Sequence, residues 1–521
     1  MVEPLSLGFF IILTILLALA FDFVNGFHDS ANAIATVVAT KVLKPFQAVL
    51  MAGVFNFIGP FVFTLAVANA IGKGIIDTKD SSVAAAFVVV VFAALVGATV
   101  WDLITWYYGL PTSSSHAIVG GLVGAALAAG GPAAVLLPTW AEVLGIGKWT
   151  VIGAALGVAG GVGLWVWSRI RLPRALFGPL MISGAVAGLV LGASLNGLFE
   201  VRGKDVAEVV LMTFVFGIMG TAVGALAWIT TQAHLPAKAL PGFTLVGALV
   251  ALVTVTLNKA LPMGGLTKTL LFMIVSPMLG FLAGYLLSII VMWLGRSTRP
   301  AKVDRWSRKL QIASSAFYAL THGTNDAQKT MGVIGVLLFG AGAIGLTSSG
   351  NLAIPVWVII ASAAAMGLGT MFGGWRIVHT MANRITHLRP AQGVAAETGG
   401  GVVLVAMASA GIPVSTTHAI SSSIMGVGAS KRASAVRWGV GRRIVGAWLI
   451  TIPASALVAF LTFLAVDGAV AEFLDTPAGF AVAVVVTLAV TGFLLWIGHR
   501  GAHGTTPRVS GEGTGHGSEP G

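Results

Sequence analysis

Two short polar boxes, set in apolar sequence and similar to one another, hold the residues with the clearest chemistry. "GLPTSSSHAI" occupies Gly109–Ile118, and "GIPVSTTHAI" occupies Gly411–Ile420, 302 residues later. In each copy a proline precedes hydroxyl residues that favour helix N-caps, and an apolar run follows as the expected helix. Hydroxyls and the free N–H groups of a helix N-terminus can receive an anion. We call these segments hydroxyl boxes 1 and 2, and they predict two duplicated anion cradles.

A second repeated pair carries carboxylates. "NGFHDSAN" spans Asn25–Asn32 and "HGTNDAQK" spans His322–Lys329, at the similar offset of 297 residues. We call them Asp boxes 1 and 2, after Asp29 and Asp326. A carboxylate in an apolar helix is costly and by default functional, so both boxes predict cation sites. Lys329, three residues after Asp326, fits either a local counter-ion or a structural ion pair.

Breaks in the helices are expected at both kinds of box. Gly26 interrupts an apolar run, and Asp29 and Asn32 follow on one helical face before a new apolar run begins. Pro111 and Pro413 predict comparable breaks at the hydroxyl boxes. Backbone exposed by a break is tolerated at membrane depth only where it faces protein or a wet cavity. Paired interrupted helices in two halves therefore predict a transporter binding site near the bilayer midplane.

The composition of the chain is that of a membrane bundle. Of 521 residues, 56% are hydrophobic and 9% are charged, and the mean hydropathy is +0.94. We expect an all-α polytopic membrane protein with about 10–12 transmembrane helices, lying in the plasma membrane and embedded in its lipid bilayer. The net charge of +12 sits in short basic clusters between apolar spans, which indicates topology signals and not a nucleic-acid partner. Cysteine is absent, which excludes disulfides and thiolate sites.

The order of the boxes predicts two repeats joined by other segments. Three basic clusters, near 169–174, 296–309 and 431–443, are expected on the cytoplasmic side. Four apolar runs, an even number, lie between the first two clusters, near 175–195, 208–230, 241–257 and 268–294. The expected divisions are a first repeat (1–130), intervening transmembrane helices (131–295), a basic cytoplasmic linker (296–310), a second repeat (311–465), a C-terminal transmembrane helix (466–499) and a Gly-rich disordered tail (500–521).

At these motifs the chain resembles the PiT family of inorganic phosphate transporters, in its bacterial low-affinity branch. The family's duplicated signature has the form G-A-N-D-x-x-N, and here the copies are "GFHDSAN" and "GTNDAQK". The resemblance covers about residues 5–130 and 311–465. It implies import of inorganic phosphate by symport with sodium or protons, through alternating access around two inverted repeats.

The resemblance also implies a set of site residues. The implied phosphate-binding hydroxyls are Thr112, Ser113, Ser114, Ser415, Thr416 and Thr417. The cation or proton coupling residues that it implies are Asp29, Asp326, Asn325 and Glu397, with Asp29 and Asp326 as the place for a sodium ion. We add Asn25, His28 and Asn32 of Asp box 1 as further candidates for coupling. No cofactor is expected beyond the co-transported cation.

Two departures from the family pattern concern the coupling ion. His28 replaces the signature Asn of the first copy, and Leu95 stands where the duplication would place a partner of Glu397. Sodium prefers oxygen ligands, whereas an imidazole can carry a proton near neutral pH, so these departures favour protons. Neither hydroxyl box contains Arg or Lys, and we infer that the co-transported cation supplies the positive charge that an anion needs.

Other functions fit the sequence less well or cannot be separated from phosphate import. Another tetrahedral oxyanion such as sulfate, or a metal–phosphate complex, would suit the same architecture. A passive channel does not require two asymmetric halves. An intramembrane hydrolase would pair Ser113 or Ser115 with His116, but adjacent residues rarely reach that geometry on a helix, and an enzyme is not expected. The oligomeric state is open, with a homodimer as the candidate assembly.

Overall fold

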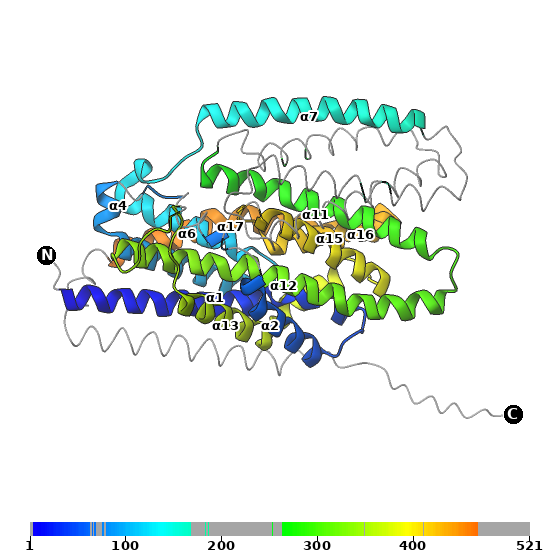
Figure 1. Cartoon of the computed structure of the whole chain (residues 1–521), viewed down its shortest axis with the longest axis horizontal. Coiled ribbons are helices and arrows are strands. Elements are labelled where there is room, and N and C mark those ends of the chain that lie inside the picture. Colours follow the sequence, from blue (N-terminus) through cyan, green and yellow to red (C-terminus); the bar gives the residue numbers. More distant parts are fainter. Residues whose placement is uncertain are drawn as a thin grey trace.

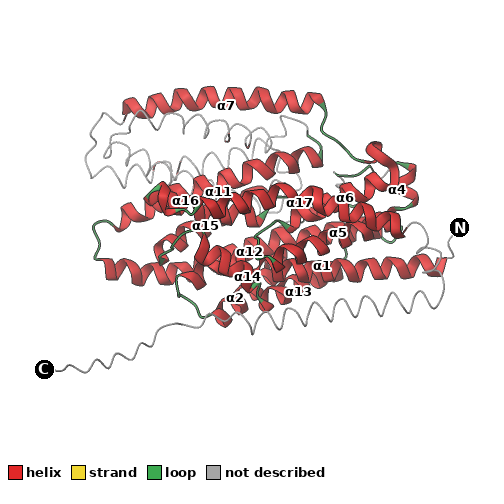
Figure 2. Cartoon of the chain, turned by 180° about the vertical axis from the view of Figure 1, so that it is seen from behind, coloured by secondary structure: helices red, strands yellow, loops and turns green. Residues whose placement is uncertain are grey.

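The protein is all-helical wherever the structure describes it. The computed structural model describes residues 4–62, 80–167, 263–348, 350–409 and 411–466, together with 65, 67, 68, 75–77, 183, 186, 249 and 253. Within these ranges there are helices, turns and two isolated β-bridges but no strand (Figure 2). This confirms the all-α class that the composition predicts.

The N-terminal half contains Asp box 1 and hydroxyl box 1. They are α1 (Pro4–Ala39), α2 (Pro45–Val62), α4 (Ser81–Ala85), α5 (Phe87–Tyr107), α6 (Ser114–Gly130), the 3₁₀ turn η1 (Gly131–Ala134) and α7 (Trp140–Trp167). Asp box 1 lies inside α1, and hydroxyl box 1 lies at the junction of α5 and α6.

The C-terminal half has a corresponding order. Its helices are α11 (Gly265–Gly295), α12 (Pro300–Gly340), α13 (Val356–Phe372), α14 (Trp375–His379), the π-helical turn η4 (Thr380–Arg384), α15 (Pro390–Ser409), α16 (Thr416–Lys431), the 3₁₀ turn η5 (Ala433–Ala435) and α17 (Trp438–Ala465). Asp box 2 lies inside α12, and hydroxyl box 2 lies between α15 and α16.

The central pair of helices, α1 and α12, runs in opposite directions. Thr40, directly after α1, donates to Gln311 in the N-terminal part of α12, whereas the backbone of Ala33 accepts from Ser315 one turn further along α12. Figure 1 shows α1 extending from the N-terminus and α12 returning from the loop after α11. The helices that carry the two Asp boxes are therefore antiparallel, as inverted repeats require.

The helices around this pair exchange partners between the halves. α1 packs against α13, α12 packs against α2, and α6 and α5 pack against α17. α16 and α15, in contrast, pack against α11 of their own half. Each half thus supplies a helix to the flank of the other half (Figure 1). This interlocking brings segments about 300 residues apart into one site.

The predicted break at Asp box 1 is wrong, because α1 continues through Gly26 without interruption. A Cβ at Gly26 would collide with the backbone carbonyl of Met366 in α13, and a Cβ at the equivalent Gly323 would collide with that of Asn56 in α2. Both glycines therefore serve close helix crossing, which small residues permit in membrane bundles. The Asp boxes lie on continuous helices.

Seven described helices are long and apolar enough to cross a membrane, and the pair α13 with α14–η4, bent by 58°, brings the number to eight. These helices make the chain a multi-pass membrane protein. Three predicted apolar runs, near 175–195, 208–230 and 241–257, lie almost wholly outside the described residues, as do the basic cluster near 169–174, the helix at 466–499 and the tail at 500–521. The total of 10–12 crossings stays a prediction.

The predicted linker is largely helical. Pro300 begins α12, so only residues 296–299 connect α11 to it, and Arg305 and Arg308 are exposed on the first turns. The guanidinium of Arg308 donates to the carbonyl of Lys41 at 3.3 Å, next to the end of α1. The C-terminal end of α1 and the N-terminal end of α12 therefore share a basic face, and its cytoplasmic location stays a prediction of the positive-inside rule.

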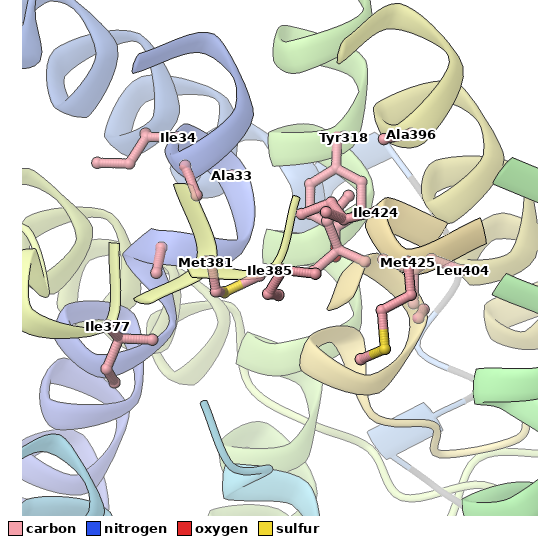
Figure 3. Close-up of a cluster of buried hydrophobic side chains, with 14 of the residues drawn as sticks. Ala33, Ile34, Tyr318, Ile377, Met381, Ile385, Ala396, Leu404, Ile424 and Met425 are labelled. Carbon is pink, nitrogen blue, oxygen red and sulfur yellow. The ribbon is translucent and has the colours of Figure 1, made fainter. Parts of the chain in front are cut away.

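The apolar core forms two clusters of buried side chains, one toward each end of the central pair. One cluster joins α1, α12, α15, α16 and the bent α14–η4 segment, and Figure 3 shows Tyr318, Met381 and Ile385 among its side chains. Tyr318 is fully buried, and its hydroxyl donates to the carbonyl of Thr416 at 3.0 Å. This contact fixes the start of α16 against α12.

Candidate functional site

The two hydroxyl boxes have the same local structure. Gly109 and Gly411 both have φ 64°, a left-handed conformation that suits glycine, and each closes the helix before its box. Ser113 caps α6 by accepting from the backbone N–H of His116 at 3.3 Å, and Ser415 caps α16 by accepting from that of His418 at 3.1 Å. The predicted breaks at the hydroxyl boxes are confirmed.

Asp29 lies against the start of α16. Its Oδ2 accepts from the hydroxyls of Thr416 and Thr417 at 3.4 and 3.2 Å, and its Oδ1 lies 2.6 Å from Nδ1 of His28. The amide of Asn32 donates to Thr417 at 2.9 Å. Asp box 1 therefore contacts hydroxyl box 2, which belongs to the other half.

Asp326 lies on the opposite side of the same centre. Its Oδ2 accepts from Thr416 at 3.1 Å and lies 3.3 Å from Nε2 of His322, and its Oδ1 pairs with the ammonium of Lys329. The same ammonium donates to Ser115 of hydroxyl box 1. Thr416 thus links both carboxylates, and Lys329 links Asp box 2 to the other hydroxyl box.

The remaining contacts of Asp box 1 lead to hydroxyl box 1. Ser114 donates to Oδ1 of Asn25 at 2.6 Å. Nε2 of His28 lies 3.1 Å from the hydroxyl of Thr105 and 3.4 Å from that of Thr112, and Thr112 donates to Thr105 at 2.8 Å. All these side chains are buried. The polar network is therefore enclosed by the bundle.

The histidines that end the hydroxyl boxes meet each other. The rings of His116 and His418 lie edge to face with centroids 4.7 Å apart, and His418 stacks on Trp448 at 3.9 Å. The indole of Trp448 donates to the carbonyl of Pro111 at 2.9 Å. These contacts hold the starts of α6 and α16 together, so packing is one role of both histidines.

Glu397 lies outside this centre, in a polar cluster of its own. Its Oε1 accepts from Thr36 at 2.6 Å and from Gln311 at 3.1 Å, and its Oε2 accepts from Ser314. Glu397 is fully buried. Thr36 is seven residues beyond Asp29 on α1, about 10 Å along the helix. The carboxylate of Glu397 is therefore displaced from the site toward the basic end of α1 and α12.

Most of the predicted site residues lie together at the centre between α1 and α12. The sequence analysis did not predict some of the residues that contact them there. Asn325 donates to the carbonyl of Thr321 at 2.9 Å, and its own Oδ1 has no partner among the described residues. His322 was not singled out, although it precedes Asp326 by four residues and so shares its helical face. Lys329, on another helix, places a buried positive charge next to hydroxyl box 1. That a co-transported cation supplies positive charge as well stays a prediction.

The centre has ligands that could hold a metal ion. Asp29, His322 and Asp326 each offer one ligand atom, and these atoms lie within 4.8 Å of one another. Two carboxylates and an imidazole suit a divalent transition metal better than sodium. The carboxylates with the hydroxyls of Thr416 and Thr417 would instead offer oxygen ligands alone.

The chain is similar to known transporters over most of its length. The model of the "Phosphate transporter family" matches residues 25–178 and 174–459. A "Probable low-affinity inorganic phosphate transporter" of Rhizobium meliloti (strain 1021) is 38% identical over 453 residues, covering 87% of this chain and 95% of the relative. One of the same description from Bacillus subtilis (strain 168) is 34% identical and covers 87% and 96%.

A solved structure described as "The sodium-dependent phosphate transporter" has the same fold, with a TM-score of 0.56 at 21% identity, covering 88% of this chain and 99% of that chain. Together with the spanning helices, the relatives identify a multi-pass protein of the plasma membrane. The chain belongs to the phosphate transporter family.

Proposed function

We propose that this chain imports inorganic phosphate together with a cation, by alternating access around the centre between α1 and α12. The observation that supports this most directly is the convergence of two helix starts, with their hydroxyls, on two buried carboxylates from antiparallel helices. Hydroxyls and helix N-termini offer partial positive charge to an anion without trapping it. The proposed phosphate ligands are Thr112, Ser113, Ser114, Ser415, Thr416 and Thr417.

The charges of the centre explain why a cation must accompany the anion. The ionised carboxylates of Asp29 and Asp326 and the ammonium of Lys329 together carry one net negative charge when the histidines are neutral. The buried carboxyl groups of Asp22 and Asp102 lie near these residues and add no positive charge. An anion entering a buried site of that sign is repelled unless a cation enters as well. Each ion then lowers the cost of binding the other, which is the coupling that symport requires.

The environment of Asp29 favours a proton as the coupling cation. His28 lies 2.6 Å from Oδ1 of Asp29 and takes one of the carboxylate oxygens that a sodium ion would need. An imidazole and a carboxylate in contact can pass a proton between them. Glu397 is a second candidate proton site, because its buried carboxylate accepts three hydrogen bonds but contacts no cationic side chain among the described residues.

The test is uptake of labelled phosphate into proteoliposomes that contain the purified protein, with sodium and proton gradients imposed separately. We expect accumulation under the proton gradient, and we expect Asp29→Asn and Asp326→Asn to abolish it while remaining in the membrane. Asp304→Asn is the matched control, because that carboxylate of α12 is exposed and pairs with Arg308. Normal accumulation in either site variant would contradict the proposal, and so would the absence of uptake under both gradients.

A metal–phosphate complex is a second candidate substrate, supported by the grouping of Asp29, His322 and Asp326. In that case labelled manganese should enter with phosphate in a fixed ratio, and His322→Asn should reduce manganese entry more than phosphate entry. If phosphate enters unchanged after all divalent metal has been chelated, the complex is not the substrate. Competition by sulfate tests the remaining oxyanion alternative.

A further inference from the structure

The two Asp boxes end in different residues that make equivalent contacts. Asn32 of box 1 donates from Nδ2 to Thr417 at 2.9 Å, and Lys329 of box 2 donates from Nζ to Ser115. Asn32 and Lys329 correspond at the offset of the Asp boxes, and Ser115 and Thr417 correspond at the offset of the hydroxyl boxes. An amide in one half and an ammonium in the other therefore occupy matching places.

The ammonium of Lys329 is held as a bound cation would be. It contacts Oδ1 of Asp326 and the hydroxyl oxygen of Ser115, and the side chain is fully buried. Carboxylate and hydroxyl oxygens are ligands that proteins use for hard cations. An ammonium donates up to three hydrogen bonds to such oxygens and carries the same charge as sodium.

The matching place in the first half lacks a cationic side chain of this kind. Asp29 accepts from the hydroxyls of Thr416 and Thr417 and contacts His28, and no described Lys or Arg pairs with it. Oδ1 of Asn32 is buried and has no partner among the described residues. A carboxylate next to an unsatisfied amide oxygen is a place where a mobile cation or proton gains from binding.

We propose that Lys329 is a tethered cation that permanently fills the cation position of the second half, so that mobile cations couple to transport only through the first half. This inference rests on the proposed phosphate symport. The tethered charge neutralises Asp326 and faces hydroxyl box 1, but it cannot leave with the substrate. It therefore lowers by one the number of cations that must enter with each phosphate.

The variant that tests this is Lys329→Asn, which gives the second half the residue that the first half has at Asn32. In proteoliposomes the coupling ratio is the number of cations per phosphate, found from the cation gradient that just balances a fixed phosphate gradient. Sodium and protons serve as the probes. We expect the ratio to rise by one in Lys329→Asn, because a mobile cation must now neutralise Asp326.

The duplication offers two matched controls. Asn32→Lys places a second tether in the first half and should lower the ratio by one, and the exchange Asn32→Lys with Lys329→Asn should restore the original ratio. The exchanged protein keeps the same composition and the same net charge in the centre. Asn32→Lys alone tests the inference even if Lys329→Asn does not fold, because an unchanged ratio in a folded Asn32→Lys protein would contradict it.

The results that overturn the inference differ from those that overturn the proposed function. An unchanged ratio in Lys329→Asn shows that the ammonium does not stand in for a mobile cation. The inference is also overturned if Lys329→Asn folds but fails to bind phosphate at every sodium concentration and every pH tested. In that case a mobile cation would not replace the lost ammonium charge. Failure of the unmodified protein to take up phosphate at all would instead contradict the proposed function.

Discussion

Substitution of Glu397 has a cost that can be worked out from its hydrogen bonds. Thr36 and Gln311 donate to Oε1 at 2.6 and 3.1 Å, and Ser314 donates to Oε2. Glu397→Gln keeps the shape and one acceptor oxygen, which can serve Thr36 and Gln311. The hydroxyl of Ser314 keeps its second acceptor, the carbonyl of Gln311 at 3.2 Å, and can accept from the new amide. The cost is then the loss of charge assistance, about 1 kcal/mol.

Glu397→Leu should cost more, although leucine is the residue at the equivalent position, Leu95, in the other half. Leucine accepts no hydrogen bond, so the hydroxyl of Thr36 and the amide of Gln311 both lose the acceptor that Glu397 provides. A buried donor left unsatisfied costs about 1–3 kcal/mol, which gives about 2–6 kcal/mol for the two. The free energy of unfolding, measured for both variants in the same detergent, should follow this order.

A double-mutant cycle with Thr36→Val separates hydrogen bonding from packing. In the unmodified protein the valine removes a donor from Glu397 and should destabilise, whereas in the Glu397→Leu background it removes an unsatisfied hydroxyl and should be neutral or stabilising. If Glu397→Leu is as stable as the unmodified protein, Thr36 and Gln311 do not depend on the carboxylate as their acceptor. An equal effect of Thr36→Val in both backgrounds would contradict the reasoning as well.

Two further pairs of substitutions exploit the duplication. Gly26→Ala and Gly323→Ala should each lower the free energy of unfolding by about 1–3 kcal/mol, because their Cβ atoms meet backbone of the facing helix. Gly147→Ala, with nothing within 4 Å, is the control, and equal stability of all three would refute the packing role. Ser113→Ala and Ser415→Ala should each lose about 1 kcal/mol as caps and also raise the half-saturation concentration for phosphate. An unchanged concentration in both would leave these hydroxyls as caps alone.

The local parts of this fold could be predicted from the sequence because their causes are local. Pro111 and Pro413 with the hydroxyls that follow them define helix starts by backbone chemistry alone. The glycines that close the preceding helices, Gly109 and Gly411, take the left-handed conformation that few other residues tolerate. The duplication was visible for the same reason, since both copies need the same residue types at the same spacing.

The misreading of Gly26 has a different cause. A glycine in an apolar run serves equally well as a break or as a point of close helix approach. Which of the two applies depends on the facing helix, here α13 with Met366, which is 340 residues away in the chain. Sequence patterns within one helix contain no such information.

The partners of the charged residues could not be predicted for the same reason. Lys329 reaches Ser115 across 214 residues, and Glu397 takes its donors from two other helices. Residue spacing along one helix predicts only contacts within about one turn of that helix, such as Asp326 with Lys329. Buried polar networks in membrane bundles are assembled between helices, so their membership depends on the tertiary fold.

The differences between the two halves are consistent with the proposed binding of one phosphate with a mobile cation in only one of the two repeats. A strictly symmetric centre would present two equivalent carboxylates, and both would need a cation before an anion could bind. In this chain the halves share helix starts, caps and crossings but differ at the positions that face the centre. The differing pairs are Asn25 with His322, His28 with Asn325, and Asn32 with Lys329. These exchanges put the fixed positive charge in one half, whereas Asp29 in the other half contacts hydroxyls and an imidazole but no described Lys or Arg. This difference suits the proposed binding of one anion with a cation on one side.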